Sequence, residues 1–167
     1  TGGPTPGLGC AGRGIIATFS LLEDLELFET HQPDVVLYDV LGDVVCGGFS
    51  MPMRRGYADK VFVITSGENM AIHAAANIAM AVENFKDRGY AQLGGLILNR
   101  RNVKNEDAKV EELAEDIHSK VIGTLSRSAL VTDAEEQKKT VIEAYPDSEM
   151  AEEYRILAGK IRTLCEI

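Results

Sequence analysis

The stretch Val35-Val36-Leu37-Tyr38-Asp39-Val40-Leu41-Gly42-Asp43-Val44-Val45-Cys46-Gly47-Gly48 sets an apolar run before two aspartates, a cysteine and paired glycines. A short apolar run that ends in a carboxylate is typical of a buried parallel strand, and α/β proteins usually bind ligands where such strands end. We therefore predict a strand over residues 35–38 and a binding loop from Asp39 to Cys46.

The residue types of this loop suit two kinds of ligand. A carboxylate such as Asp39 can hold Mg²⁺ through water or orient a water that attacks a nucleotide, whereas a thiolate such as Cys46 binds soft metals and iron–sulfur clusters. Fully extended, the step from Asp39 to Cys46 spans up to about 25 Å. The loop is therefore long enough to link two separate sites.

Composition fits one α/β domain over residues 1–167, since 45% of the chain is hydrophobic and 26% is charged. A net charge of −9 argues against nucleic acid and anionic membrane as partners. No apolar run approaches the roughly 18 residues of a membrane span, and no signal peptide is visible, so we expect a cytoplasmic protein. The chain opens on Thr1 without an initiator Met, and we expect it to begin within a longer protein.

Alternating strand and helix patterns follow the loop and predict a doubly wound unit. The expected strands are residues 61–65, 93–99 and 120–125, and the expected helices are residues 15–28, 70–86, 106–118 and 147–165. Residues 1–14 hold six glycines and two prolines, which predicts a shaped loop without helix. Asn99 follows an expected strand, where it would either contact a base or close a turn.

The chain has three cysteines, and this odd number weakens the case for a disulfide framework and leaves metal binding or plain packing. Cys10 and Cys46 lie on glycine-rich loops, whereas Cys165 is expected to be a passive, partly buried thiol. Because iron–sulfur clusters commonly take four thiolates, a two-fold dimer would complete the site that two thiolates begin. A Cys10–Cys46 disulfide, which a cytosolic setting disfavours, and a zinc bridged between chains are the alternatives.

Three segments closely resemble the nitrogenase iron protein family, which includes the iron proteins of dark chlorophyllide reduction and of nickel-tetrapyrrole maturation. These segments are residues 7–14, 38–49 and 93–99, and the similarity runs over nearly the whole chain. The resemblance implies a P-loop NTPase-like α/β fold with a mostly parallel sheet flanked by helices. It also implies that the chain is the C-terminal part of such a domain, because no G-x-x-x-x-G-K-[ST] phosphate loop occurs here.

The resemblance implies roles for individual residues. Cys10 and Cys46 would hold a [4Fe-4S] cluster between two identical subunits. Asp39 would lie near the Mg²⁺ of bound ATP or ADP, and Asp43 would orient or activate the hydrolytic water. The other implied site positions are Gly42 near the terminal phosphate, Asn99 at the adenine, and Arg127 and Tyr154 in the nucleotide site. Arg13 would lie at the partner-docking face, where it matches an arginine that is ADP-ribosylated in some members.

The implied activity is that of an oxidoreductase coupled to ATP hydrolysis. A donor such as ferredoxin or flavodoxin would reduce the cluster of a homodimer, which would pass single electrons to a larger nitrogenase or nitrogenase-like reductase. The base pocket departs from the pattern of nitrogenase iron proteins, which favours a nitrogenase-like role. The departures are Ser126 in place of a proline, Ser128 in place of an acidic residue, and Thr132 and Met150 in place of glutamines.

Two other functions stay open. A cluster-binding or carrier dimer without ATPase activity is motivated by the absence of a phosphate loop from this sequence. A partitioning-type ATPase of the same broad fold would not need Cys10 and Cys46.

Overall fold

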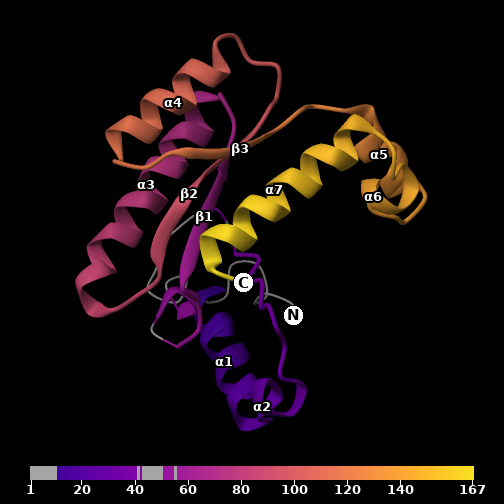
Figure 1. The fold of residues 1–167 in the computed structure, drawn as a ribbon. Coiled ribbons are helices and arrows are strands. Elements are labelled where there is room, and N and C mark those ends of the chain that lie inside the picture. The colour runs from indigo at the N-terminus through magenta and orange to yellow at the C-terminus, as the bar shows by residue number, and fades with distance from the viewer. Residues whose placement is uncertain (1–10, 41, 43–50, 55) are drawn as a thin grey trace.

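A computed structural model describes residues 11–40, 42, 51–54 and 56–167 (Figure 1). Within these residues, three parallel strands form a sheet in the order β1-β2-β3. The strands are β1 (Lys60–Thr65), β2 (Gln92–Asn99) and β3 (Val121–Leu125). Helix α3 (Asn69–Phe85) connects β1 to β2, and α4 (Glu106–Asp116) connects β2 to β3. The predicted α/β fold with a parallel sheet flanked by helices is confirmed.

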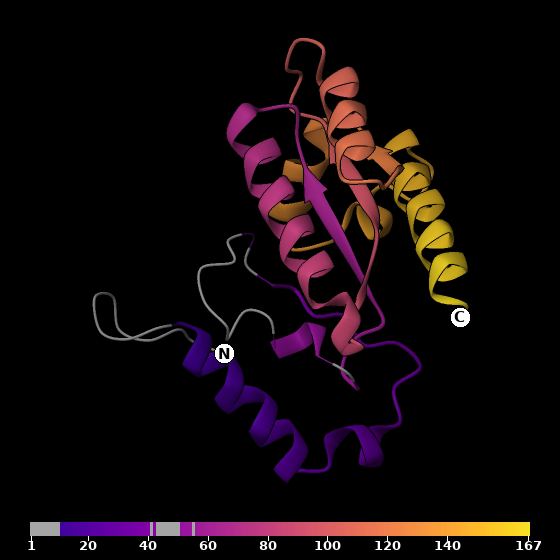
Figure 2. The same ribbon diagram turned by 90° about the vertical axis from the view of Figure 1, so that its left-hand side faces the viewer.

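The alternation of side chains along β2 builds a core on each face of the sheet. Leu96 and Leu98 point to one face, where they pack with Val110 of α4 and with residues of α3. Ile97 points to the other face and packs against α7 (Glu149–Cys165). Figures 1 and 2 show α3 and α4 side by side on one side of the sheet, with α7 on the other.

The remaining described elements lie before and after this sheet along the chain, apart from a short 3-10 helix between α3 and β2. They are α1 (Ala11–Asp24), α2 (Leu27–His31), α5 (Ala129–Glu136), α6 (Val141–Ala144) and the short 3-10 helices η1 (Met51–Met53) and η2 (Lys86–Arg88). In Figure 1, α1 and α2 lie together far from α5 and α6. None of the helices in the described ranges is long and apolar enough to cross a membrane.

The sequence predicted most elements from β1 onward to within two residues. Strands 61–65, 93–99 and 120–125 and helices 70–86, 106–118 and 147–165 are confirmed. Helix α5 was not predicted, although its N-cap residue Ser128, whose hydroxyl accepts a hydrogen bond from Leu130 N, is a usual start signal.

Two predictions near the N-terminus are wrong. The expected glycine-rich loop 1–14 gives way to helix at Ala11, and that helix ends at Asp24 rather than near residue 28. Phe19, only 5% exposed, packs on the rings of Tyr38 and Tyr57. This packing outweighs the low helix propensity of glycine. The helix ends early because Glu26 adopts a left-handed conformation, with φ of 48°.

The predicted strand over 35–38 is also wrong. Residues 35–40 carry no strand assignment, and among the described residues β1 pairs with β2 alone. Leu37 is 85% exposed and Ile64 of β1 is 64% exposed. An apolar run becomes a strand only where a neighbouring backbone satisfies its N–H and C=O groups, and no described segment does so here.

Candidate functional site

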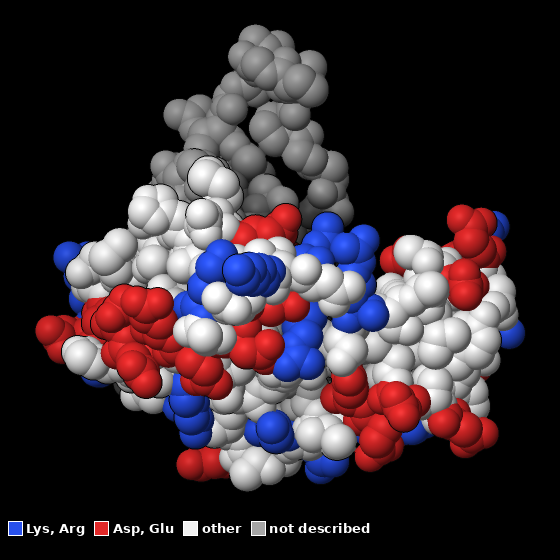
Figure 3. All heavy atoms as spheres, turned by 90° about the horizontal axis from the view of Figure 1, so that it is seen from above, with Lys and Arg blue, Asp and Glu red and all other residues white. Residues whose placement is uncertain are grey.

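The candidate site lies at the carboxyl ends of β2 and β3, where three of the predicted residues gather. Asn99 is the exposed last residue of β2, Arg127 follows the end of β3, and Tyr154 lies in α7. The backbone N–H of Arg100 donates to the carbonyl of Leu125 at 2.9 Å, which keeps the two strand ends together. Figure 3 views the molecule from this end, and basic and acidic side chains are interspersed across the face.

A buried carboxylate fixes the loop between β2 and α4. Glu106, which is 5% exposed, accepts hydrogen bonds from the backbone N–H groups of Arg101 at 3.0 Å and Asn102 at 3.1 Å. Asn102 has a positive φ of 61°, and its backbone N–H faces Glu106 at the start of the helix that follows. A carboxylate in the first turn of a helix also interacts favourably with the helix dipole. The loop that begins at Asn99 is therefore held in one conformation.

The turn after β1 packs against the start of α4 at Gly67. A Cβ built on Gly67 would lie 2.6 Å from Glu106 Cα, so only glycine allows this approach. Lys109 of α4 donates from Nζ to the carbonyl of Gly67 and to Asn69 Oδ1, both at 3.3 Å. An open hollow of about 470 Å³ lies here, lined by Gly67, Glu68, Asn69, Met70, Ala71, Val103 and Lys109. Lys109 thus ties the start of α3 and the turn after β1 to α4.

The loops carry one strongly paired cation. Arg100 donates a hydrogen bond to Asp107, and this bond raises the pKa of the guanidinium. Partial burial lowers that pKa, while the charges of Asp107, Glu106 and Glu153 raise it further. Arg100 therefore remains charged and partly balances the carboxylates that hold the loops.

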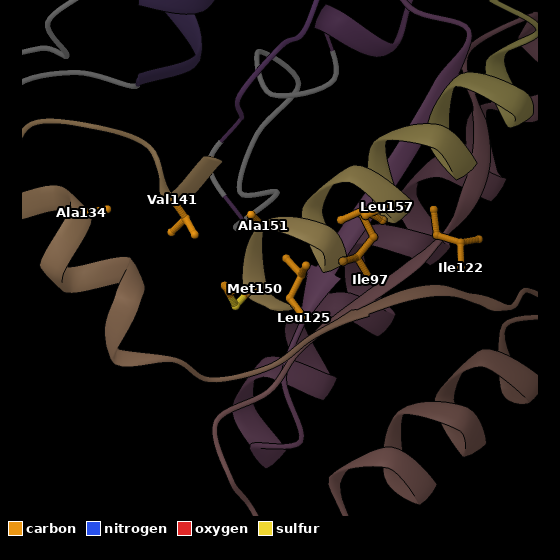
Figure 4. Packing of buried hydrophobic residues seen from close by; sticks show 8 residues of the cluster. All are labelled: Ile97, Ile122, Leu125, Ala134, Val141, Met150, Ala151 and Leu157. Carbon is orange, nitrogen blue, oxygen red and sulfur yellow. The ribbon is translucent and has the colours of Figure 1, made fainter. Parts of the chain in front are cut away.

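Helix α7 holds Tyr154 against the core. Its N-cap residue Ser148 accepts a hydrogen bond from Ala151 N at 3.1 Å. Met150, Ala151 and Leu157 are buried in one cluster with residues of β2 and β3 (Figure 4). Tyr154 is half-buried against this cluster, so its position follows from the packing of the whole helix.

Arg127 connects the two loops directly. Its Nη1 donates to the carbonyl of Arg101 at 3.3 Å, so the segment after β3 lies beside the loop after β2. The structure thus places Asn99, Arg127 and Tyr154 on segments that meet at one end of the sheet.

Of the other predicted residues, the structure describes Asp39 and Gly42 in full and Arg13 in its backbone. Asp39 is exposed in the extended segment 35–40, and Gly42 is exposed in a bend. No hydrogen bond or ion pair among the described residues joins Asp39 to the loops after β2 and β3. Cys10, Asp43 and Cys46 lie outside the described residues, and so does the side chain of Arg13, whose backbone is in α1.

Among the described residues, no group of three or more His, Cys, Asp or Glu side chains is arranged to hold a metal ion. Cys165 is a free thiol and is partly buried, as predicted.

Sequence reasoning missed the residues that support the site. Glu106, Lys109 and Gly67 received no role, although an acidic residue at the start of α4 is a usual signal of a helix first turn. Their contacts span about 40 positions of sequence, as between Lys109 and Gly67. Local spacing therefore gave no sign that these residues meet.

Comparison with known proteins decides the family. The model of the "4Fe-4S iron sulfur cluster binding proteins, NifH/frxC family" matches residues 1–166. The chain belongs to this family. The resemblance drawn from residues 7–14, 38–49 and 93–99 is confirmed.

Relatives in this family are described as nitrogenase iron proteins. The protein of Methanospirillum hungatei JF-1 is 51% identical over 164 residues, which cover 97% of this chain and 58% of the relative. Nitrogenase iron protein 2 of Methanothermobacter thermautotrophicus is 50% identical over 161 residues, which cover 96% of this chain and 59% of the relative. The chain thus spans less than two thirds of the length of these NifH/frxC family members.

Solved structures agree on the fold. The MinD cell division protein of Aquifex aeolicus matches with a TM-score of 0.62 at 18% identity and covers 92% of this chain and 61% of its own. The MinD cell division ATPase of Pyrococcus furiosus matches with a TM-score of 0.51 at 17% identity, over 65% of this chain and 44% of its own. At these identities the likeness shows the fold alone, an α/β arrangement with a parallel sheet flanked by helices.

Proposed function

We propose that this protein is an ATP-dependent iron–sulfur reductase component that passes single electrons from a [4Fe-4S] cluster to a larger nitrogenase or nitrogenase-like reductase. The observation that carries the proposal is the family match over residues 1–166, which takes in both cysteine motifs. Identities of 45–51% to nitrogenase iron proteins support it.

Cys10 and Cys46 are the proposed cluster ligands. The donor set fits, because thiolates are the usual ligands of such clusters and two per chain become four about a two-fold axis. A homodimer is therefore part of the proposal. When bound, the cluster supplies one-electron redox chemistry, and the chain holds it and presents it to the partner. The docking face would include Arg13, and a ferredoxin or flavodoxin would act as donor.

The nucleotide is proposed to bind at the carboxyl end of the sheet. The exposed amide of Asn99 has both a donor and an acceptor, which suits the edge of adenine, and Arg127 and Tyr154 would flank the base. Asp39 would hold Mg²⁺ through water, and Gly42 would lie near the terminal phosphate. Asp43 would take a proton from the water that attacks this phosphate. The loop from Asp39 to Cys46 would then change position with nucleotide state, as switch loops do.

Residues 1–167 are proposed to form one domain with the phosphate-binding segment of the intact protein. Two features of β1 support this arrangement. Among the described residues β1 pairs with β2 alone, and the side chain of Ile64 in β1 is 64% exposed.

The test uses the full-length gene product purified without oxygen. We expect about four irons and four labile sulfides per dimer, together with ATP hydrolysis that accompanies electron transfer. Cys10→Ser and Cys46→Ser should each abolish cluster binding, whereas Cys165→Ser, at the end of α7, should retain it. Absence of a cluster from the unaltered protein would overturn the proposal, and a cluster without nucleotide binding would favour a carrier instead.

A further inference from the structure

Glu153 of α7 contacts the residue that follows β3 at two points. Its Oε2 accepts a hydrogen bond from the backbone N–H of Ser126 at 2.6 Å, and its Oε1 accepts one from Ser126 Oγ at 2.7 Å. Hydrogen bonds to an ionised carboxylate are shorter and stronger than those between neutral groups. Both residues are half-buried, which limits competition from water.

The contact links two of the residues assigned to the nucleotide. Ser126 immediately precedes Arg127, and Glu153 immediately precedes Tyr154. Ser126 and Glu153 lie 27 positions apart, so the contact fixes the segment after β3 relative to α7. Arg127 in turn donates to the carbonyl of Arg101 in the loop that follows Asn99. A displacement of Ser126 would therefore move Arg127 away from the carbonyl of Arg101 and from α7, which carries Tyr154.

The contact is separable from the packing that holds α7. Met150, Ala151 and Leu157 are buried in the core cluster on the same helix, whereas the carboxylate of Glu153 lies outside that cluster. Loss of the carboxylate should leave α7 in place and release only the segment 126–128.

We propose that Glu153 is a positioning residue for the nucleotide base: by holding Ser126 through its N–H and hydroxyl, it keeps Arg127 and Tyr154 in the arrangement that receives a purine. This inference rests on the proposed function. It concerns the base alone, because the phosphates would be bound by other parts of the intact protein.

The experiment separates base binding from phosphate binding in the full-length protein. Dissociation constants are measured for MgATP and, by competition, for magnesium tripolyphosphate, which lacks the base. Glu153→Gln keeps the size of the side chain but loses the charge and one acceptor. It should weaken MgATP binding about tenfold, because a hydrogen bond to a charged group is lost. Tripolyphosphate binding should stay unchanged.

Two further variants complete the test. Ser126→Ala removes only the hydroxyl and should weaken MgATP binding less than Glu153→Gln. In the double variant the two losses should be less than additive, because both act through one contact. Glu152→Gln is the matched control, since Glu152 is exposed on the same helix and lies 3.5 Å from Arg155. It should bind both ligands as the unaltered protein does.

The outcomes distinguish the positioning role from the proposed function. Equal MgATP affinity in Glu153→Gln and the unaltered protein would overturn the positioning role and leave the proposed function intact. An equal loss of MgATP and tripolyphosphate binding would also overturn it, because that loss would indicate a general structural effect. Failure of the unaltered protein to bind MgATP would overturn both this inference and the proposed function.

Discussion

Gly67, in the turn after β1, lies against Glu106 at the start of α4 so closely that a Cβ on Gly67 would approach Glu106 Cα to 2.6 Å. The same glutamate accepts two backbone hydrogen bonds from the loop after β2. One pair of residues therefore joins the turn after β1 to the loop that carries Asn99.

Gly67→Ala should lower the free energy of unfolding by about 1–3 kcal/mol, because the added methyl group overlaps backbone that cannot move without disturbing α4. Denaturant unfolding of the intact protein measures the change. Gly159→Ala is the matched control: apart from its chain neighbours and the nearby backbone of α7, no atom lies within 4 Å of a Cβ built on Gly159, and alanine favours helix there. A Gly67→Ala protein as stable as the control would contradict the close approach.

Glu106→Gln should also destabilise the protein, by about 1–3 kcal/mol, because the buried carboxylate that two backbone N–H groups share loses its charge and one acceptor. Hydrogen exchange should speed up at the amides of Arg101 and Asn102, which donate to this carboxylate. Glu112→Gln, on the exposed side of α4, should change neither quantity. Unchanged exchange at both amides would show that Glu106 does not hold the loop.

Phe19→Ala should lower the free energy of unfolding by about 3–5 kcal/mol, as expected for loss of a buried aromatic ring. Phe19 lies 5.2 Å from the ring of Tyr38 and 4.7 Å from that of Tyr57, measured between centroids. Leu21→Ala, at a position 55% exposed on the same helix, should cost far less. Similar losses in the two variants would mean that α1 does not pack through Phe19.

The capping box at the start of α6 should make stability depend on pH. Hydrogen bonds from the backbone and hydroxyl of Thr140 lower the pKa of the Glu143 carboxyl. Because the pKa of this carboxyl is lower in the folded state than in the unfolded state, its ionised form stabilises the fold at pH values above the unfolded-state pKa of about 4.3. This stabilisation is lost as the pH falls through the folded-state pKa.

Thermal unfolding of Glu143→Gln, compared with the unaltered protein, measures this effect. The variant should melt at a lower temperature at pH 7, and the difference should shrink on acidification. Glu136→Gln, at the exposed end of α5, serves as control and should show no such trend. A difference that stays constant from pH 7 to below pH 4 would contradict the assignment.

The sequence by itself determined the order of the three strands and of helices α3, α4 and α7, together with the family. Alternation of apolar residues marks strands and a period near four marks helices, and these signals are local enough to read directly. The cysteine and aspartate motifs likewise identified the family without structural help. The misreading of residues 35–38 shows the limit of such signals, because an apolar run is a strand only when another backbone pairs with it.

Only the tertiary structure decided which residues support one another at the carboxyl end of the sheet. Gly67 with Glu106, and Ser126 with Glu153, are pairs far apart in the chain whose members look like ordinary surface or turn residues. Their meeting depends on how α4 and α7 pack across the two faces of β2. That packing is set by the combined burial of many side chains, so no spacing within the sequence encodes it.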